Sequence, residues 1–106
     1  MKLDEIKDVP SAMLFLEHLY AEGWRVIEQG PAGEVKAAII AAQRIIARHD
    51  EFTVSYDREV SAALDPYWHF ANGDLSKADF IHLCGKQLAR CLELLTRHFK
   101  TVGVQL

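Results

Sequence analysis

The C-terminal third of this chain repeats apolar residues at the spacing of an α-helix, and no other feature constrains the fold as strongly. The apolar positions follow one another at alternating intervals of three and four residues; they are Ile81, Cys84, Leu88, Cys91 and Leu95. This spacing places their side chains on one face of a helix, where they form a seam for packing against another helix. We therefore predict one continuous amphipathic helix over residues 76–100.

Two earlier segments also show helical periodicity, and residues that favour helix ends bound them. The first predicted helix covers residues 10–22, with Asp8 or Ser11 available as its N-cap and Gly23 at its end. The second covers residues 31–49 and begins at Pro31, a residue that the first helical turn tolerates. Its alanines allow a neighbouring backbone to approach closely, so we expect it in the interior.

The segment before the C-terminal helix is less regular. Ser55 or Asp57 can cap a short third helix, which Asp65-Pro66 interrupts before an irregular, aromatic-rich segment. The fold class that we predict is all-α, a small antiparallel four-helix bundle with a long C-terminal helix. For residues 24–29 the sequence pattern does not decide between a short strand and an extended segment that crosses the core.

Composition places the chain among globular proteins of one domain, residues 1–106. Half of its residues are hydrophobic and 25% are charged, far from the signature of disorder. The net charge of −3 argues against nucleic-acid binding, because neutralising phosphates needs clustered excess Lys and Arg. A stripe of basic residues on the C-terminal helix keeps that function as a weaker alternative; it consists of Lys86, Arg90, Arg97 and Lys100.

No segment has the length and hydropathy of a membrane span. The longest apolar run, residues 37–42, ends at Gln43, and acidic residues interrupt residues 1–8 where a signal peptide needs an apolar stretch. We therefore expect a cytoplasmic protein without a membrane partner. Cys84 and Cys91 lie about 10 Å apart along one helix, too far for a disulfide, so we expect reduced thiols.

The sequence contains no motif of nucleophilic, phosphate-binding or zinc chemistry, so no catalytic residue is predicted. The five histidines are scattered, and neither Cys-x-x-Cys nor His-Glu-x-x-His occurs, so we predict no metal and no cofactor. The sequence therefore favours a binding protein over an enzyme. The alternative is a metal-dependent hydrolase of the all-α nucleotide pyrophosphatase type; its acids and histidine would be Asp57, Glu59, Asp79 and His82.

Large aromatic residues concentrate in the predicted connections instead of the regular helices. Such rings either plug the ends of a small bundle or line a recognition surface, because they give much contact area at low entropy cost. The candidate binding residues are Tyr67, Trp68, Phe70, Tyr56 and Trp24. We predict a non-catalytic binding or regulatory module that recognises a protein partner or a small apolar ligand through this aromatic-rich surface.

The length of the predicted C-terminal helix also suggests self-association. A helix over residues 76–100 would extend about 37 Å, longer than the helix over residues 10–22 can cover. Because a second copy of the chain could cover the remainder, we expect a homodimer.

Overall fold

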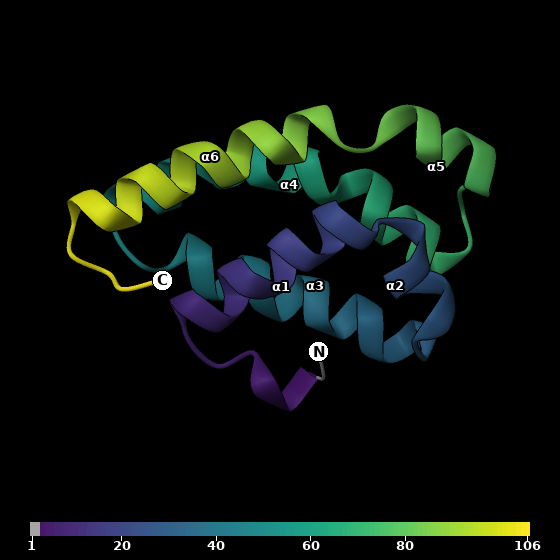
Figure 1. Cartoon of the computed structure of the whole chain (residues 1–106), viewed down its shortest axis with the longest axis horizontal. Coiled ribbons are helices and arrows are strands. Elements are labelled where there is room, and N and C mark those ends of the chain that lie inside the picture. The colour runs from purple at the N-terminus through teal and green to yellow at the C-terminus, as the bar shows by residue number, and fades with distance from the viewer. Residues whose placement is uncertain (1–2) are drawn as a thin grey trace.

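The computed structural model describes residues 3–106 and shows an all-α fold, as predicted (Figure 1). Met1 and Lys2, which begin the charged segment considered above, lie outside the described residues. None of residues 3–106 forms a strand. The elements are a short 3-10 helix at Leu3–Glu5 and six α-helices: α1 (Val9–Glu22), α2 (Trp24–Gln29), α3 (Ala32–Ala47), α4 (Glu51–Asn72), α5 (Lys77–Leu83) and α6 (Lys86–Thr101).

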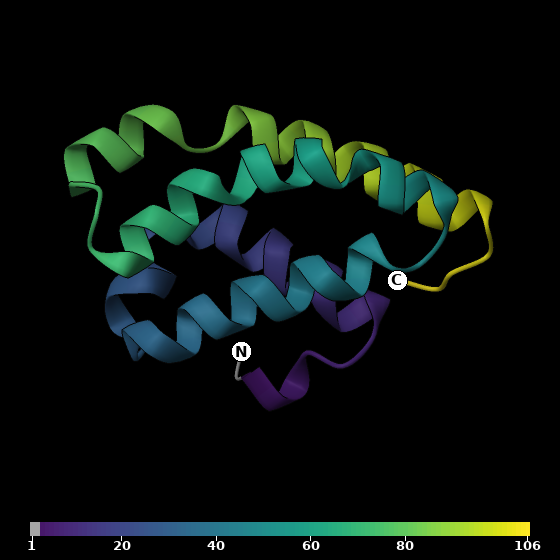
Figure 2. The ribbon, with the colours of Figure 1, turned by 180° about the vertical axis from the view of Figure 1, so that it is seen from behind.

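The four longer helices contact one another in a closed circuit. Helix α3 packs against α1 and α4, α6 packs against α4 and α1, and the short helices α2 and α5 lie together at one end (Figures 1 and 2). All six helices contribute buried side chains to one hydrophobic cluster. The expected number of four helices is not confirmed, because two additional short helices form.

Helix α1 has the ends that the sequence predicts. The Asp8 side chain accepts a hydrogen bond from the Ser11 N–H (3.0 Å), and the Ser11 hydroxyl accepts one from the Asp8 N–H (3.1 Å). Gly23 ends the helix with a φ of 53°, a left-handed conformation that glycine adopts without a Cβ penalty. The six residues that follow form α2, so neither the strand nor the extended crossing considered for them occurs.

Helix α4 is longer than predicted, and its N-cap is a different residue. Asp50 caps it by accepting a hydrogen bond from the Thr53 N–H (2.9 Å), so the expectation that Ser55 or Asp57 would start this helix is wrong. Thr53 is 1% exposed, and its hydroxyl accepts the Asp50 N–H in return (2.9 Å). This reciprocal pair starts the helix about one and a half to two turns before the predicted position.

The interruption expected at Asp65-Pro66 does not occur, and the aromatic-rich segment is regular helix. Pro66 lies inside α4 and removes one backbone hydrogen bond. Side chains on both sides of it are nevertheless buried, with Leu64 2% and Tyr67 1% exposed. Packing along the whole helix therefore outweighs the local effect of the proline.

The C-terminal helix is broken, which corrects the prediction of a continuous helix over residues 76–100. Helix α5 ends at Leu83, and α6 begins after Gly85, whose φ of 110° is incompatible with a helix. The predicted seam holds only within α6, where Leu88, Cys91 and Leu95 are buried. Ile81, before the break, is 53% exposed.

No helix among residues 3–106 is long and apolar enough to cross a membrane. Both cysteines have free thiols, with Cys91 buried and Cys84 half-buried. The prediction placed both cysteines on one helix, but Cys84 lies at the break between α5 and α6 and Cys91 lies within α6.

Candidate functional site

Two of the five predicted binding residues pack inside the fold. Tyr67 is 1% exposed and meets Phe80 edge to face, with ring centroids 5.1 Å apart. Phe70 is half-buried and stacks on Phe80, with ring centroids 4.6 Å apart. Phe80 comes from α5 and is fully buried, so these rings join α4 to α5.

The two tryptophans are half-buried, and lysines of the same chain lie over their rings. The Lys77 Nζ is 3.4 Å from the centroid of Trp24 and 3.8 Å from the Glu28 carboxylate. The Lys36 Nζ is 5.9 Å from the centroid of Trp68. Cation–π contacts of this kind stabilise partly exposed sites modestly. Lys77 therefore contacts one face of Trp24, and Lys36 lies over one face of Trp68 at a greater distance.

Tyr56, the fifth predicted binding residue, lies between α4 and α6. Its ring stacks on Phe52 with centroids 5.5 Å apart, and its hydroxyl donates to the Cys91 Sγ at 3.6 Å. Burial and the neighbouring Cys91 thiol raise the pKa of the Tyr56 phenol to about 12. Among the five predicted residues, ring contacts in the described chain connect only Tyr67 and Phe70, through Phe80.

A groove with a volume of about 460 Å³ lies between α1, α2 and α3. Its apolar lining comes from all three helices; it consists of Phe15, Val26, Val35 and Ala38. Phe15 and Ala38 are buried beneath it, each 2% exposed. We call this feature the α1–α3 groove.

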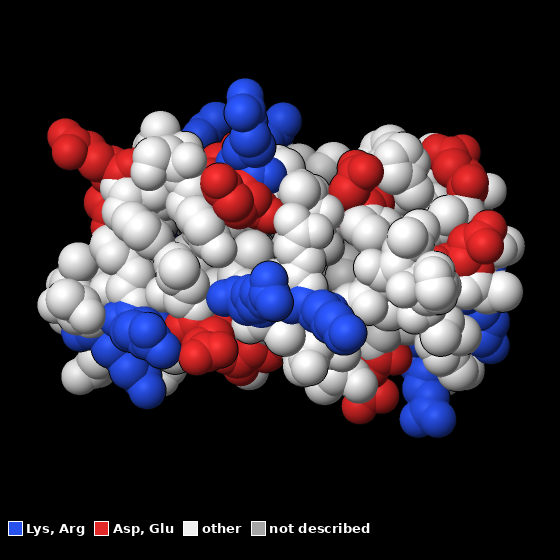
Figure 3. All heavy atoms as spheres, turned by 90° about the horizontal axis from the view of Figure 1, so that it is seen from above, with Lys and Arg blue, Asp and Glu red and all other residues white. Residues whose placement is uncertain are grey.

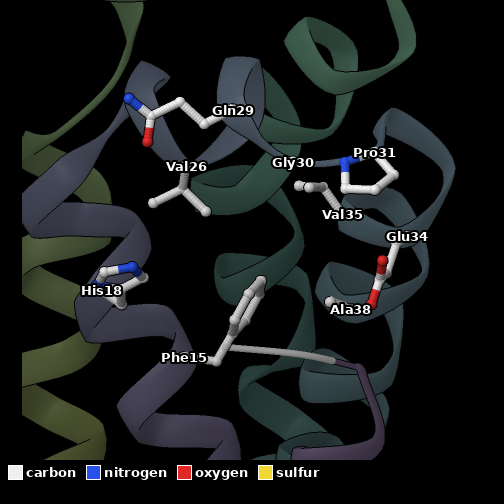
Figure 4. A pocket seen from close by; sticks show the side chains of 9 residues that line it. All are labelled: Phe15, His18, Val26, Gln29, Gly30, Pro31, Glu34, Val35 and Ala38. Atoms are coloured by element: carbon white, nitrogen blue, oxygen red, sulfur yellow. The ribbon is translucent and has the colours of Figure 1, made fainter.

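Three polar side chains line the same groove. They are His18 on α1, Gln29 on α2 and Glu34 in the first turn of α3. Figure 4 shows His18 and Glu34 on opposite sides of the hollow, with the Phe15 ring between them. All three side chains are exposed and make no hydrogen bond or ion pair with residues 3–106. Among the described residues no Lys or Arg lines the groove, and Glu34 is its only carboxylate.

The turn between α2 and α3 closes one end of the groove and depends on glycine. A Cβ added at Gly30 would lie 2.8 Å from the Val35 Cγ2 and 3.2 Å from the Val26 carbonyl oxygen. Pro31 follows directly and precedes α3. Because Gly30 lets the turn approach both valines, it sets the position of the groove wall.

A second cluster joins the turn before α4 to the last turn of α6. The Asp50 Oδ2 lies 3.0 Å from the His49 Nδ1 and 2.7 Å from the His98 Nε2. Figures 1 and 2 show the start of α4 beside the end of α6, although these residues are far apart in the sequence. Among residues 3–106 these three are the only group of three His, Cys, Asp or Glu side chains close enough to hold a metal ion.

The Asp50 carboxyl is ionised in this cluster. Its partial burial raises the pKa, but hydrogen bonds from the Thr53 N–H, His98 and His49 outweigh that effect and hold the pKa far below its usual range. An ionised carboxylate only accepts hydrogen bonds, so each imidazole directs an N–H at the shared oxygen.

The residues of the two alternative functions are not assembled in a comparable way. Asp57, Glu59, Asp79 and His82 do not form a group able to hold a metal ion among residues 3–106. The basic stripe of α6 is exposed, but Arg97 pairs with Glu93 at 3.2 Å. Figure 3 shows acidic side chains interspersed with basic ones on the face that contains α6.

Comparison with protein-family models, with curated proteins and with solved structures finds no match for this chain. Function is therefore inferred from the contacts and charges of its own residues.

Sequence reasoning did not select the residues of either the groove or the cluster. Glu34 and His18 belong to no recognisable motif, and the only local signal of the groove is the Gly30-Pro31 turn between two helices. For the cluster, the signal was the adjacent pair His49-Asp50 at a helix boundary. The third member, His98, is 48 positions further along than Asp50, and no spacing rule connects them.

Proposed function

We propose that this protein is a non-catalytic binding module that holds a small molecule in the α1–α3 groove. The ligand that fits best has an apolar, ring-like body and a cationic head. The observation that carries the proposal is an apolar floor beside one carboxylate that has no partner among residues 3–106, with no Lys or Arg among the described lining residues, in a hollow of about 460 Å³.

The size and lining of the groove support an apolar ligand body. Pockets that bind small molecules typically measure about 300–1,000 Å³ and are lined mainly by apolar side chains. The groove lies within that range, and its floor is formed by Phe15 together with Val26 and Val35. A flat ring placed over Phe15 would bury apolar surface on both molecules, which favours binding.

The polar lining supports a cationic head. The Glu34 carboxylate has no partner in the described chain, and neither does the Gln29 amide or the His18 imidazole. A carboxylate and an amide oxygen both accept hydrogen bonds, so an ammonium group would find acceptors on the groove edge. Glu34 also lies in the first turn of α3, where a negative charge favours the helix. An anionic ligand would meet repulsion from the Glu34 carboxylate, and no described Lys or Arg lines the groove to compensate it.

Three expectations from the sequence stay predictions: a protein partner at the aromatic residues, a homodimer and a cytoplasmic location. A protein partner that contacts Trp24, Trp68 or Tyr56 would use rings that are only half-exposed. Sedimentation at tens of micromolar tests the expected homodimer; a monomer would contradict it. A cytoplasmic location is likewise a proposal, supported by the absence of membrane-spanning helices among residues 3–106.

The decisive test compares three probes that share an indole body and differ in the head group. Tryptamine carries an ammonium, tryptophol a hydroxyl and indole-3-acetate a carboxylate. At about −0.3 kcal/mol per non-hydrogen atom, a ligand of about twelve atoms should bind with a dissociation constant in the millimolar range. We expect affinity to decrease from tryptamine to tryptophol to indole-3-acetate.

Two matched variants locate the charge effect. Glu34→Gln should weaken tryptamine binding about two- to fivefold, as expected for a partly exposed ion pair. It should leave tryptophol binding nearly unchanged. Glu17→Gln removes an exposed carboxylate from α1 outside the groove and should change neither affinity. Equal affinity for the three probes, or equal effects of the two variants, would contradict the proposal.

A further inference from the structure

The cluster at the α4 N-terminus and the α6 C-terminus presents two imidazole nitrogens and one carboxylate oxygen to a single point. We propose that His49, Asp50 and His98 form a binding site for one divalent transition-metal ion, of which Zn²⁺ is the representative. This site is separate from the α1–α3 groove, and it holds whether or not the groove binds a small molecule.

The kinds of ligand atoms select the class of ion. Imidazole nitrogens favour Zn²⁺ and its transition-metal neighbours, whereas Mg²⁺ and Ca²⁺ prefer sets of oxygen ligands. Zinc sites with three protein ligands leave a fourth position for water or another external ligand. The His49, Asp50 and His98 side chains are 29%, 28% and 17% exposed, so an ion can reach them from solvent.

The spacing of the ligand atoms is close to that of a tetrahedral site. Zinc–ligand bonds of about 2.0–2.1 Å place neighbouring ligand atoms about 3.3 Å apart in a tetrahedron. The Asp50 Oδ2 is 3.0 Å from the His49 Nδ1 and 2.7 Å from the His98 Nε2, and the three ligand atoms all lie within 4.8 Å of one another. Movements of about half an ångström, within reach of side-chain rotation, would therefore open the cluster around an ion.

Surrounding contacts hold the ligands in this arrangement. The Asp50 Oδ1 accepts the Thr53 N–H at 2.9 Å, which leaves Oδ2 directed at the imidazoles. Phe52 stacks on the His98 ring with centroids 4.2 Å apart, and Phe99 meets His49 edge to face at 5.2 Å. Hydrogen bonds and apolar groups around a metal site orient its ligands in the same way.

Metal binding would rearrange protons without requiring another reactant. In the present cluster the imidazole N–H groups donate to Asp50. On binding Zn²⁺, the proton of each neutral ring moves to its other nitrogen, and the His49 Nδ1 and His98 Nε2 lone pairs then face the ion. The ion would replace the Asp50–His98 hydrogen bond as the link between the α4 N-terminus and α6, and His49 would add a ligand from the turn.

The experiment must separate a metal site from a purely structural link between helices. Asp50→Asn serves this purpose, because asparagine is as good an N-cap as aspartate but loses the charged ligand oxygen. His49→Ala removes a ligand from an exposed residue of the turn. His82→Ala, on α5, removes an exposed histidine outside the cluster and serves as the matched control.

Each protein is dialysed against Zn²⁺, and bound metal is measured per chain, with Mg²⁺ as the comparison ion and circular dichroism to verify folding. We expect wild type and His82→Ala to bind one Zn²⁺ per chain and no Mg²⁺. Asp50→Asn and His49→Ala should each bind about tenfold more weakly or worse. Nitrogen NMR of the histidine rings should show His49 Nδ1 and His98 Nε2 as the nitrogens that change on adding Zn²⁺.

The proposal is overturned if wild-type protein binds no Zn²⁺ saturably, or if both cluster variants bind it as wild type does. If one variant fails to fold, the other still decides between these results. A change at ring nitrogens of other histidines would also contradict the assignment.

Discussion

The break between α5 and α6 leads to a specific prediction about Gly85. This residue has a φ of 110° and a ψ of −69°, a conformation that residues with a Cβ rarely adopt. A Cβ built at Gly85 meets nothing within 4 Å, so replacement by alanine introduces no steric clash. The effect of Gly85→Ala on stability therefore measures the backbone conformation alone.

The magnitude follows from two opposing contributions. Holding a residue other than glycine in such a conformation costs about 1–3 kcal/mol. Alanine also restricts the unfolded chain, which stabilises the folded state by about 0.4–1 kcal/mol. We expect Gly85→Ala to lower the free energy of unfolding by about 1–2 kcal/mol, which lowers the melting temperature by about 4–8 °C per kcal/mol.

Gly33→Ala is the matched control, because the same substitution should have the opposite sign there. Gly33 lies in the first turn of α3 with a negative φ, and a Cβ at this position also meets nothing within 4 Å. Alanine should therefore stabilise the protein by about 0.4–1 kcal/mol. Urea denaturation followed by circular dichroism measures both variants.

The outcome that would refute this reasoning is a Gly85→Ala protein as stable as wild type or more stable, with increased helical signal. That result would mean that residues 76–100 form the continuous helix predicted from the apolar spacing. The break would then not be a property of the backbone at Gly85.

Two further predictions concern the tyrosines. Tyr67→Ala should lower the free energy of unfolding by about 3–5 kcal/mol, because the ring is 1% exposed and packs on Phe80. Trp68→Ala should cost clearly less in a urea denaturation series, since that ring is only half-buried, and equal losses would contradict the assigned packing. The Tyr56 phenol, with its pKa raised from 10.0 to about 12, stays neutral in the folded protein where the unfolded chain ionises. The contribution of Tyr56 to the free energy of unfolding is fully present below pH 10 and is lost as the pH rises towards 12. Tyr56→Phe should therefore lose less stability than wild type over that pH range. Equal slopes for wild type and Tyr56→Phe would count against the raised pKa.

The sequence predicts those parts of the fold that depend on local signals. Helix α1 has its cap at Asp8 and its end at Gly23, both within one turn of the apolar residues that they bound. The helical class also follows from periodicity along α3 and α6. These features are correct because short-range contacts determine them.

The sequence predicted a break in α4 that does not occur and did not predict the break between α5 and α6. Packing explains both errors. The apolar spacing continues through Gly85. It could not show that Phe80 and Leu88, both buried, belong to two separate helices. Pro66 indicated a break where none occurs, because buried residues flank it on both sides. Tertiary contacts decide such cases, and a single sequence does not show them.

The candidate sites depend still more on distant contacts. The α1–α3 groove needs Phe15 and Glu34 from different helices, and only the turn at Gly30 shows how those helices meet. The cluster of His49, Asp50 and His98 brings His98 to Asp50 across most of the second half of the chain. Neither arrangement has a characteristic spacing, so no motif could have indicated it.

The most direct test of the proposed binding function is a map of backbone amide chemical shifts during titration with tryptamine. We predict that the perturbed amides lie around the groove, between Phe15 and Ala38, with the largest changes at the turn containing Gly30. Perturbations centred elsewhere, for example on the exposed face of α6, or no saturable change at all, would contradict it.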